Sequence, residues 1–572
     1  MDNKEIANIL NEIALMLSLD ESASKFEVRA YQKAAFTIST LQEPISDIYK
    51  RGGIKALMEL PGIGKTIALH IEEYIKNGRI KKYEMLKKKY PIDFNNLTSI
   101  TGMGAKRALL LYKKLGIKNM DDLKKALEQH RILSLEGFGE RSEELIKKGI
   151  ELYEKSKGRM LLGDALPIAE SIVKRLKESN LVDKIMIAGS TRRMRETVGD
   201  LDILAISKKQ EQVMDFFTSL DNVERIVSKG PTKTTVWLKE GLSCDLRVLE
   251  PESFGAAVQY FTGSKEHNIE LRQVAISKGY KLNEYGLFDK NNKNIGGDDE
   301  KSIYEKLGMD YIPPEMREGR GEIALAEKHK IPKLVELTDI QGDLHTHTKE
   351  TDGANSAEEM VDEAKKIGYK YIAITNHTKS LRIARGMNDL QFIKFFKKLE
   401  NTDFGDIKVL KGAEVDILED GTLDLENKTL KEMDCVIAAV HSKLSMSEEE
   451  MTKRVIKALD SGYVNIFAHP TGRLINEREP YKINLEKVAE AAERNNVALE
   501  INSFPNRLDL NDSNILMLSK YNLMFSIDTD SHRTSNLYYM RFGVGMARRG
   551  WLTKKQIINT MDYKSLISWL GK

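Results

Sequence analysis

The residues with the clearest chemical potential lie between Gly189 and Ile206, in the run GSTRRMRETVGDLDILAI. Asp200 and Asp202 open an apolar segment that we expect to be a strand, in which side chains two apart point to the same face. Such a carboxylate pair is repulsive unless a cation lies between its members, and hard oxygen ligands favour Mg²⁺ or Mn²⁺. The preceding glycine-serine turn and two arginines suit phosphate binding. The stretch predicts metal-dependent phosphoryl chemistry, although the motif alone also fits an edge strand with two solvated aspartates.

A third carboxylate, Asp245, is a candidate partner for this pair. The run 243–249 has a strand-like pattern, with Cys244, Leu246 and Val248 on one face and Asp245 on the other. Three acids can hold two metal ions, one to activate a hydroxyl nucleophile and one to stabilise a leaving pyrophosphate. Taken by itself, Asp245 would be an ordinary exposed strand residue.

A second set of chemically competent residues is the group of histidines near the carboxyl end. Ten histidines occur in the chain, and six follow Asp339: His345, His347, His377, His441, His469 and His532. The last four each end an apolar run, and two further runs end at Glu414 and Glu500. The carboxyl ends of barrel strands converge on one rim, so these side chains should meet in space. A lone histidine there is usually a core residue, but this set suits Zn²⁺, Mn²⁺ or Fe²⁺ and phosphate hydrolysis.

Length and composition limit the kinds of protein that can carry these sites. The 572 residues are too many for one core and suggest three or four domains at about 150 residues each. No segment approaches the roughly 18 uninterrupted apolar residues of a membrane span, and the start MDNKEIANIL lacks an export signal. Only Cys244 and Cys435 are present, which excludes a disulfide framework or a cysteine zinc site. We expect a cytoplasmic protein without membrane contact.

The amino-terminal part, from Lys4 to Lys155, has helical periodicity and a glycine turn that occurs three times: LPGIGK, ITGMGA and LEGFGE. Each turn precedes a helix and resembles a helix-hairpin-helix motif, which binds nucleic-acid backbones through exposed amides. Between Pro61 and Met120 the chain has thirteen Lys and Arg but only four acidic residues. This surplus of positive charge fits a polyanion-binding surface or a solvated helical surface. The third turn is followed by Glu140 and not by a basic residue, so it is the least suited of the three to bind phosphate. The expected DNA-backbone contacts are Gly62, Gly64, Lys65, Gly102, Gly104 and Lys106.

The remaining elements alternate between helix and strand. We expect a helix over 166–176 and strands over 185–188, 201–206, 234–238 and 243–249. A linker with a Pro-Pro start and a charged body is expected from Pro313 to Asp339. Beyond Asp339 strands alternate with amphipathic helices, which predicts an α/β barrel-like domain.

The run GSTRRMRETVGDLDIL, the later CDLRV and the segment YFTGSKEHNIELR from Tyr260 together resemble family X DNA polymerases, over about residues 1–314. The resemblance implies that Asp200, Asp202 and Asp245 are catalytic carboxylates that bind Mg²⁺ or Mn²⁺. It also implies residues that hold the triphosphate (Gly189, Ser190 and Arg193), line the sugar pocket (Tyr260, Phe261 and Gly263) and lie near the nascent base pair (Asn268 and Arg272). Without the resemblance, Tyr260 and Phe261 would be read as core aromatics.

One residue departs from the family pattern. Relatives with sugar-phosphate lyase activity carry a Schiff-base lysine after the first glycine turn, where this chain has His70. Because an imidazole cannot form that imine, lyase activity by the usual route is not expected. Lys65, Lys81 or Lys82 could substitute for it.

The pattern DLHTHTKETDG with the later histidines resembles the polymerase and histidinol phosphatase (PHP) domain, a distorted seven-stranded barrel, over about residues 340–572. The resemblance implies up to three Zn²⁺, Mn²⁺ or Fe²⁺ ions, with Glu414 bridging two of them. It implies nine ligands: His345, His347, Asp352, His377, Glu414, His441, His469, Asp530 and His532. Asn376 stands where many relatives carry aspartate, while Glu500 and Asp528 are either supporting or structural residues.

These expectations define a multidomain fold. An all-α helix-hairpin-helix region precedes an α+β nucleotidyltransferase palm with a thumb and a distorted (β/α)7 PHP barrel. The expected parts are a lyase-like DNA-binding domain (1–90), a second helical domain (91–157), the palm (158–250), the thumb (251–314), a linker (315–339) and the PHP domain (340–572).

The expected function is a monomeric DNA-directed DNA polymerase that uses dNTPs on gapped or primer-template DNA in base-excision repair. Its PHP site would act as a 3′–5′ exonuclease and in 3′-end processing, including abasic-site cleavage. The alternative is a small-molecule phosphoesterase of the histidinol phosphatase kind tethered to DNA. A purely structural DNA-end binder is disfavoured because both metal sites keep their ligands.

Overall fold

The computed structural model describes residues 3–18, 24–39, 45–60, 62–98, 100, 103–135, 137–156 and 158–571. It contains two compact units, Met1–Lys157 and Gly158–Lys572, and each is considered by itself. Among the described residues, no helix has the length and apolar character needed to cross a membrane.

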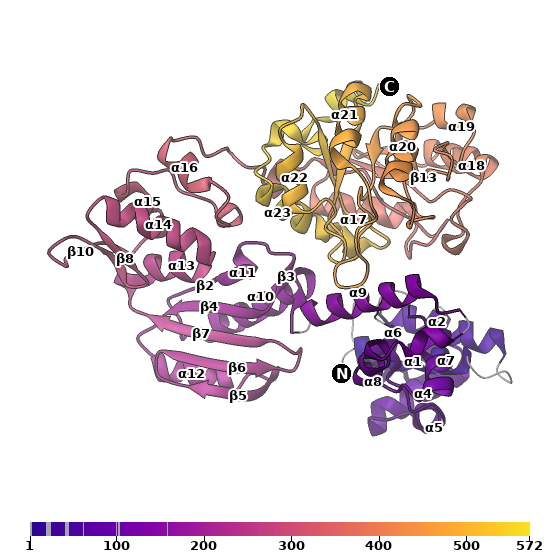
Figure 1. The fold of residues 1–572 in the computed structure, drawn as a ribbon, viewed down its shortest axis with the longest axis horizontal. Helices are drawn as coiled ribbons and strands as arrows, with labels where there is room; N and C mark the ends of the chain where they lie inside the picture. The colour runs from indigo at the N-terminus through magenta and orange to yellow at the C-terminus, as the bar shows by residue number, and fades with distance from the viewer. Residues whose placement is uncertain are drawn as a thin grey trace. The chain divides into compact units, whose positions relative to one another are not determined.

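The described part of the first unit is helical, as predicted (Figure 1). In its first helix Ile6, Leu10, Ile13 and Leu17 recur at three- and four-residue spacing, and all are buried in one core with residues of the later helices. Two helices begin directly after glycines, Gly64 and Gly104. The helices are α1 (Asn3–Ser18), α2 (Lys25–Ser39), α3 (Ile45–Met58), α4 (Lys65–Asn77), α5 (Lys81–Lys89), α6 (Phe94–Thr98), α7 (Ala105–Leu115), α8 (Met120–Glu128), the 3-10 turn η1 (Arg131–Ser134) and α9 (Glu140–Ser156).

The second unit begins with a five-stranded sheet in the order β2-β4-β7-β6-β5, in which only β4 and β7 run parallel (Figure 1). Alternate residues of β4 and β7, such as Leu201 and Cys244, pack in a core with α10 and α12. Leu204 lies on the opposite face, against α13. The elements are β1 (Met160–Leu161), α10 (Leu162–Glu178), β2 (Lys184–Ile187), α11 (Gly189–Arg192), β3 (Thr197–Val198), β4 (Asp200–Ile206), α12 (Gln210–Thr218), β5 (Val223–Lys229), β6 (Lys233–Leu238) and β7 (Ser243–Leu249).

A small subdomain of helices and a three-stranded sheet, with its own core, follows the five-stranded sheet. Its elements are η2 (Pro251–Ser253), α13 (Phe254–Thr262), α14 (Lys265–Ser277), β8 (Lys281–Asn283), β9 (Gly286–Phe288), β10 (Asn294–Gly296), α15 (Glu300–Lys306), η3 (Pro314–Met316) and α16 (Glu322–Glu327). The segment 315–339, which we expected to be a linker, contains α16 and buries Met316, Ile323, Ala326 and Leu334 in this core. Its apolar residues at three-residue spacing explain why it packs despite its charged composition.

The rest of the unit is a parallel barrel of seven strands in sequence order, β11 to β17. The strands are β11 (Gly342–Asp343), β12 (Tyr371–Ile374), β13 (Lys408–Asp416), β14 (Cys435–Ala439), β15 (Ile466–Phe467), β16 (Ala498–Asn502) and β17 (Phe525–Asp528). The helices are α17 (Ala357–Ile367), α18 (Asp389–Glu400), α19 (Asn427–Lys431), α20 (Glu448–Leu459), α21 (Leu485–Asn495), α22 (Asp512–Leu518), α23 (Met540–Arg549) and α24 (Tyr563–Trp569), with 3-10 turns η4 (Leu337–Asp339), η5 (Arg382–Ala384), η6 (Thr534–Tyr539), η7 (Lys554–Gln556) and η8 (Ile558–Thr560).

Side chains join the first and last strands of the barrel. Asp528 accepts a hydrogen bond from the Leu344 amide at 2.9 Å, and Asp343 accepts one from the Thr529 amide at 3.2 Å. Beyond them the His347 amide donates to the Ser531 carbonyl at 2.8 Å. Asp528 is thus a structural residue of this seam. The nearly closed barrel confirms the predicted (β/α)7 fold class.

Candidate metal centres and nucleotide site

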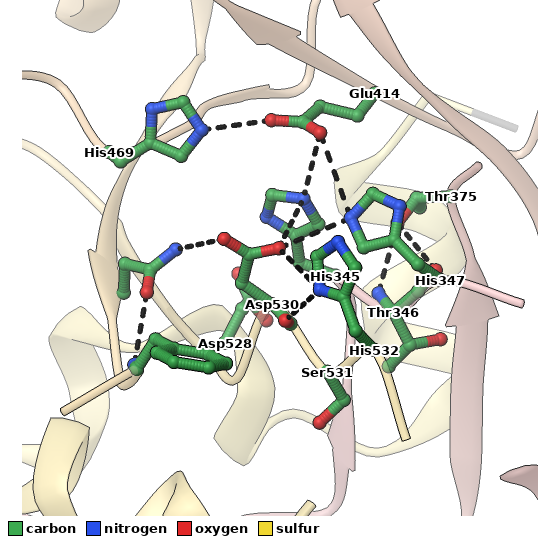
Figure 2. Close-up of polar contacts among 12 residues, drawn as sticks. His345, Thr346, His347, Thr375, Glu414, His469, Asp528, Asp530, Ser531 and His532 are labelled. Carbon is green, nitrogen blue, oxygen red and sulfur yellow. Dashed lines mark hydrogen bonds and ion pairs between the residues drawn. The ribbon is translucent and has the colours of Figure 1, made fainter. Parts of the chain in front are cut away.

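All nine predicted ligands of the barrel meet at the carboxyl ends of its strands. Figure 2 shows His345, His347, Glu414, His469, Asp530 and His532 pointing toward one another. Glu414 lies on β13, two residues before the strand ends at Asp416. The other ligands lie in loops that follow β11, β12, β14, β15 and β17. They form three overlapping groups: His347, Asp352, His377 and His532; His345, His347 and Glu414; and His377, Glu414 and His441. His469 approaches Glu414 at 2.9 Å, and Asp530 approaches His347 at 3.2 Å.

Glu414 is the centre of this cluster. Its Oε2 lies 2.7 Å from His377 Nδ1 and 3.5 Å from His345 Nε2, whereas its Oε1 lies 3.2 Å from His441 Nε2. Despite these short contacts, several buried atoms of the described residues make no hydrogen bond of acceptable geometry: His345 Nε2, both ring nitrogens of His347, His377 Nδ1, Asp352 Oδ1, Glu414 Oε2 and His469 Nδ1. Unpartnered buried polar atoms are costly, so this donor set fits divalent cations.

The charges of the cluster shift its pKa values in opposite directions. Burial and the neighbouring His377 and His532 lower the pKa of His347 to about 3. Burial alone would also lower the pKa of His377, but Glu414 and Asp352 raise it to about 10. The pKa of His441 is raised to about 9 by Glu414 and Asp416 against the effect of burial. The neighbouring carboxylates thus keep His377 and His441 protonated, and a metal ion would have to displace these protons in order to bind.

Further residues orient these ligands. Glu500, whose role we left open, contacts His345 Nδ1 at 2.6 Å and accepts a hydrogen bond from the His469 amide. Two supporting residues were missed by sequence reasoning: Asp416, 3.0 Å from His441 Nδ1, and Asn502, which donates to Asp530 at 3.2 Å. The position of Asp416 two residues after Glu414 on one strand could have identified it.

Asn376, which replaces the aspartate of many relatives, is buried and supports a loop. Its side-chain oxygen accepts hydrogen bonds from the Thr348 amide at 2.8 Å and from the Thr351 hydroxyl at 3.1 Å. These bonds order the loop that leads to the predicted ligand Asp352. The amide therefore has a positioning role of its own in this chain.

In the five-stranded sheet, Asp202 on β4 is in register with Asp245 on β7. Burial, followed by the charges of Asp200 and Asp245, raises the pKa of Asp202 to about 7. Asp245 is also held by Lys233 Nζ at 2.7 Å and by the Thr235 hydroxyl at 2.6 Å. The three predicted carboxylates are close enough to influence one another, as a shared cation would require.

Gly189 lies directly beside this carboxylate group. It has a φ of +62°, and a Cβ atom there would lie 2.4 Å from Asp202 Oδ2. Glycine is thus required both by the left-handed backbone and by the close approach of the carboxylate. The turn that could bind phosphate is in this way placed against the candidate metal site.

A cavity of about 590 Å³ adjoins this turn. It brings together Asp200, Asp202 and all eight predicted nucleotide contacts: Gly189, Ser190, Arg193, Tyr260, Phe261, Gly263, Asn268 and Arg272. Asn268 is fixed by a hydrogen bond to the Tyr260 carbonyl at 2.7 Å. Asp245 is not among the lining residues, whereas Arg159, Arg195, Lys265 and Glu318, which we did not predict, are. The positive charge of Arg159, Arg195 and Lys265 suits a triphosphate, but their sequence positions gave no signal, and neither did that of Glu318.

The candidate DNA-backbone contacts lie in the first unit. Gly64 and Gly104 are the N-cap residues of α4 and α7, and neither cap has a side-chain hydrogen bond. The following Lys65 and Lys106 are exposed. Gly62 has a φ of +79°. Gly102 lies outside the described residues.

His70, at the expected lyase position, contacts the Tyr31 hydroxyl at 2.9 Å. Burial, followed by the charge of Lys82, lowers the pKa of His70. A neutral imidazole bonded to a phenol is a hydrogen-bonding group and not an imine-forming nucleophile.

Comparisons with known families agree with this architecture. The model of a helix-hairpin-helix domain matches residues 1–80, and that of a SAM-like helix-hairpin-helix tandem matches residues 94–151. The model of the DNA polymerase beta thumb matches residues 257–318, and that of the PHP domain matches residues 343–504.

Individual relatives extend over one part of the chain or all of it. A probable phosphatase of Thermoanaerobacter sp. (strain X514) is 30% identical over 229 residues, 38% of this chain and 89% of its own length. DNA polymerase lambda of Arabidopsis thaliana is 26% identical over 55% of this chain and 62% of its own length. The DNA polymerase/3′-5′ exonuclease PolX of Bacillus subtilis (strain 168) is 36% identical over 577 aligned positions, 100% of both chains. Since that relationship covers both candidate sites, the chain belongs to the family X DNA polymerases that carry a carboxy-terminal PHP domain.

Proposed function

We propose that this chain, a DNA-directed DNA polymerase with a metal-dependent PHP 3′–5′ exonuclease, fills short gaps in base-excision repair with its palm and processes 3′ ends with its barrel. The observation that carries the proposal is the cavity that joins Asp200 and Asp202 to the eight candidate nucleotide contacts. A metal site next to a phosphate-binding turn and an aromatic wall suits a nucleoside triphosphate.

In the palm, each group has a positioning task. Asp200, Asp202 and Asp245 would hold Mg²⁺ or Mn²⁺, which would activate the primer hydroxyl and stabilise the leaving pyrophosphate. Gly189, Ser190 and Arg193 would bind the triphosphate through amide, hydroxyl and guanidinium donors. Tyr260, Phe261 and Gly263 would form the wall against the sugar, with Asn268 and Arg272 near the base pair.

In the barrel, the nine predicted ligands would hold up to three Zn²⁺, Mn²⁺ or Fe²⁺ ions, which would supply hydroxide and polarise a phosphodiester. Glu414 would bridge two of them, because both its oxygens face imidazoles. Glu500 and Asp416 would fix the rings of His345 and His441 through their Nδ1 atoms. We include abasic-site cleavage among the reactions to be tested at this site.

The helical parts 1–90 and 91–157 would hold gapped or primer-template DNA through their glycine turns. We keep the boundaries 158–250 and 340–572 for palm and PHP domain. The thumb, expected over 251–314, is extended to residue 334, because Met316, Ile323, Ala326 and Leu334 pack in its core. We also propose that the protein is a cytoplasmic monomer. No lyase role is assigned to His70.

The similarity of the barrel to a probable phosphatase supports a second candidate, a small-molecule phosphoesterase of the histidinol phosphatase kind. Competition between histidinol phosphate and single-stranded DNA would separate the two. A nuclease that histidinol phosphate does not inhibit at millimolar concentration favours the DNA substrate.

The decisive experiment is extension of a gapped primer with dNTPs in Mg²⁺ and in Mn²⁺, and digestion of the same primer without dNTPs. Asp200→Ala with Asp202→Ala should abolish extension and leave digestion intact. Extension by this double variant would refute the palm assignment.

A further inference from the structure

The turn that carries Arg193 rests on a helix of the barrel domain. The next residue, Met194, packs closely against Gly545 of α23. A Cβ atom added at Gly545 would lie 2.7 Å from the Met194 side chain. At the end of the same helix, Arg549 Nη1 donates a hydrogen bond to the Arg193 carbonyl at 2.7 Å. The candidate triphosphate-binding turn of the palm is thus built partly on the PHP domain.

A single carboxylate links the two arginines. Glu318 Oε1 accepts hydrogen bonds from Arg193 Nε at 3.0 Å and from Arg549 Nη1 at 2.8 Å. The side chains of Glu318 and Arg549 are only 10% and 1% exposed. Arg549 also binds Asp512 of α22, which Arg320 contacts at 3.0 Å.

The charges of this network do not cancel. Four guanidinium groups, those of Arg193, Arg195, Arg320 and Arg549, contact two carboxylates, those of Glu318 and Asp512. Burial alone would raise the pKa of Glu318, but the charges of Arg549 and Arg193 lower it, so the carboxylate is ionised. A surplus of positive charge in a poorly solvated region attracts a polyanion to the cavity that Arg193 lines.

Arg549 also limits how strongly Glu318 can hold Arg193, because both guanidinium groups share one carboxylate oxygen. If Arg549 were absent, Glu318 would pair with Arg193 and Arg195 alone. It would then compete more strongly with a triphosphate for the same guanidinium group.

We propose that Arg549 of the PHP domain is a positioning residue for the polymerase reaction, and that through Glu318 it sets the availability of Arg193 for the incoming nucleotide. This inference rests on the proposed role of Arg193 in triphosphate binding. It makes the barrel a structural part of the nucleotide site as well as a nuclease.

The test uses the full chain with Arg549→Met, which keeps the apolar stem and removes the guanidinium group. Gap filling gives KM for dNTP and kcat, and digestion of single-stranded DNA reports the barrel. We expect KM to rise about tenfold, kcat to change by less than about threefold and digestion to stay at the wild-type rate.

Arg541→Met is the matched control. Arg541 lies about two helical turns earlier on α23. It contacts both oxygens of Glu170 of the palm at 3.0 Å, so it also joins barrel and palm. It does not line the nucleotide cavity, and KM should stay at the wild-type value. In a Glu318→Gln background, Arg549→Met should raise KM little further, because the Glu318 charge through which Arg549 acts is already absent.

A wild-type KM in Arg549→Met, or an equal rise in Arg541→Met, overturns the inference. If Arg549→Met also loses digestion, its fold is damaged and Arg549→Gln, which keeps a polar side chain without the charge, decides. A raised KM with normal digestion then supports the inference, and an unchanged KM overturns it. A wild-type enzyme that extends no primer would instead refute the proposed function. Equilibrium binding of Mg²⁺-dNTP to wild type and Arg549→Met then tests the network directly: weaker binding by the variant supports it, and equal or absent binding overturns it.

Discussion

Asp202 and Asp245 lie opposite each other on the adjacent parallel strands β4 and β7. Burial of Asp202, together with the charges of Asp200 and Asp245, raises its pKa from 3.8 to about 7. A carboxyl group whose pKa is higher in the folded than in the unfolded protein stabilises the fold below the unfolded pKa. That contribution is lost as the pH rises through the folded pKa. Without a bound cation, Asp202 should therefore weaken the fold increasingly between pH 4 and pH 7.

Asp202→Asn should accordingly raise the melting temperature of the EDTA-treated protein by a few degrees at pH 8, and by less at pH 5.5. Mg²⁺ should stabilise the wild type at pH 8 but hardly affect the variant, because the attraction for the cation is reduced. Thermal unfolding at both pH values, with and without Mg²⁺, measures this. Identical melting of variant and wild type at pH 8 in EDTA would contradict the predicted charge repulsion.

The closeness of Gly189 to Asp202 gives a second prediction. Gly189→Ala should reduce nucleotide addition by about 100-fold or more, because the new Cβ would lie 2.4 Å from Asp202 Oδ2 and displace the carboxylate. Gly241→Ala is the control, since Gly241 also has a positive φ, +87°, but has nothing within 4 Å of the added atom. Both variants incur a backbone cost of about 1 kcal/mol.

Gap-filling rates of the two glycine variants separate the steric effect from the backbone effect. Gly241→Ala should extend primers within about twofold of wild type, and both should digest single-stranded DNA normally. Equal losses in the two variants would mean that backbone strain, and not the carboxylate, explains the effect.

Glu414 is predicted to be indispensable to the nuclease. It faces imidazoles through both oxygens, so Glu414→Ala should reduce digestion to the level of the EDTA-treated enzyme. Glu419→Ala removes an exposed carboxylate a few residues later, one paired with Lys443 at 3.0 Å, and should leave digestion unchanged. Primer extension by both variants checks that the palm is intact, and continued digestion by Glu414→Ala would exclude its bridging role.

The sequence predicted the strands β4 and β7 to within one residue, because their alternating pattern has a period of two. It also predicted that the histidines and Glu414 would meet at one rim, since histidines are scarce here and each follows a strand that must end there. Asp352 and Asp530 were predicted only through the resemblance to PHP domains. Asp416 was missed although it shares a face with Glu414, because a carboxylate is common and carries little information by itself.

Contacts between distant elements could not be predicted. Nothing local to Glu318 indicates that Arg549, 231 residues later, contacts it. Likewise, the charged composition of 315–339 indicated a linker, whereas Ile323 and Ala326 are buried in the thumb core. Such packing depends on the tertiary arrangement, which local periodicity does not contain.

Metal binding to the barrel should release protons. The pKa of His377 is raised to about 10 and that of His441 to about 9, chiefly by Glu414 against the effect of burial. Both rings are therefore protonated at pH 7.5 in EDTA-treated protein, and ligation requires neutral nitrogen. We expect release of about two protons from these rings when Mn²⁺ or Zn²⁺ binds at pH 7.5.

Calorimetric titration in two buffers with different ionisation enthalpies counts those protons. The number should fall as the pH passes about 9 and approach zero above about 10, and His441→Ala should release about one fewer. A binding enthalpy that does not depend on the buffer would exclude proton-coupled ligation at these histidines.

The glycine turns of the first unit give a prediction about DNA binding. Lys65 and Lys106 are exposed at the starts of α4 and α7, whose N-cap glycines have no side-chain cap. If each contacts one phosphate, each Lys→Ala change should weaken binding of gapped DNA equally for all sequences. It should also make the slope of log K against log salt shallower by about 0.9.

Lys147→Ala is the control because Lys147 is already paired with Glu143 at 2.7 Å. Fluorescence anisotropy between 50 and 200 mM salt measures the slopes, and a Lys147→Ala slope that changes as much as the other two would show that these turns have no special role in phosphate binding.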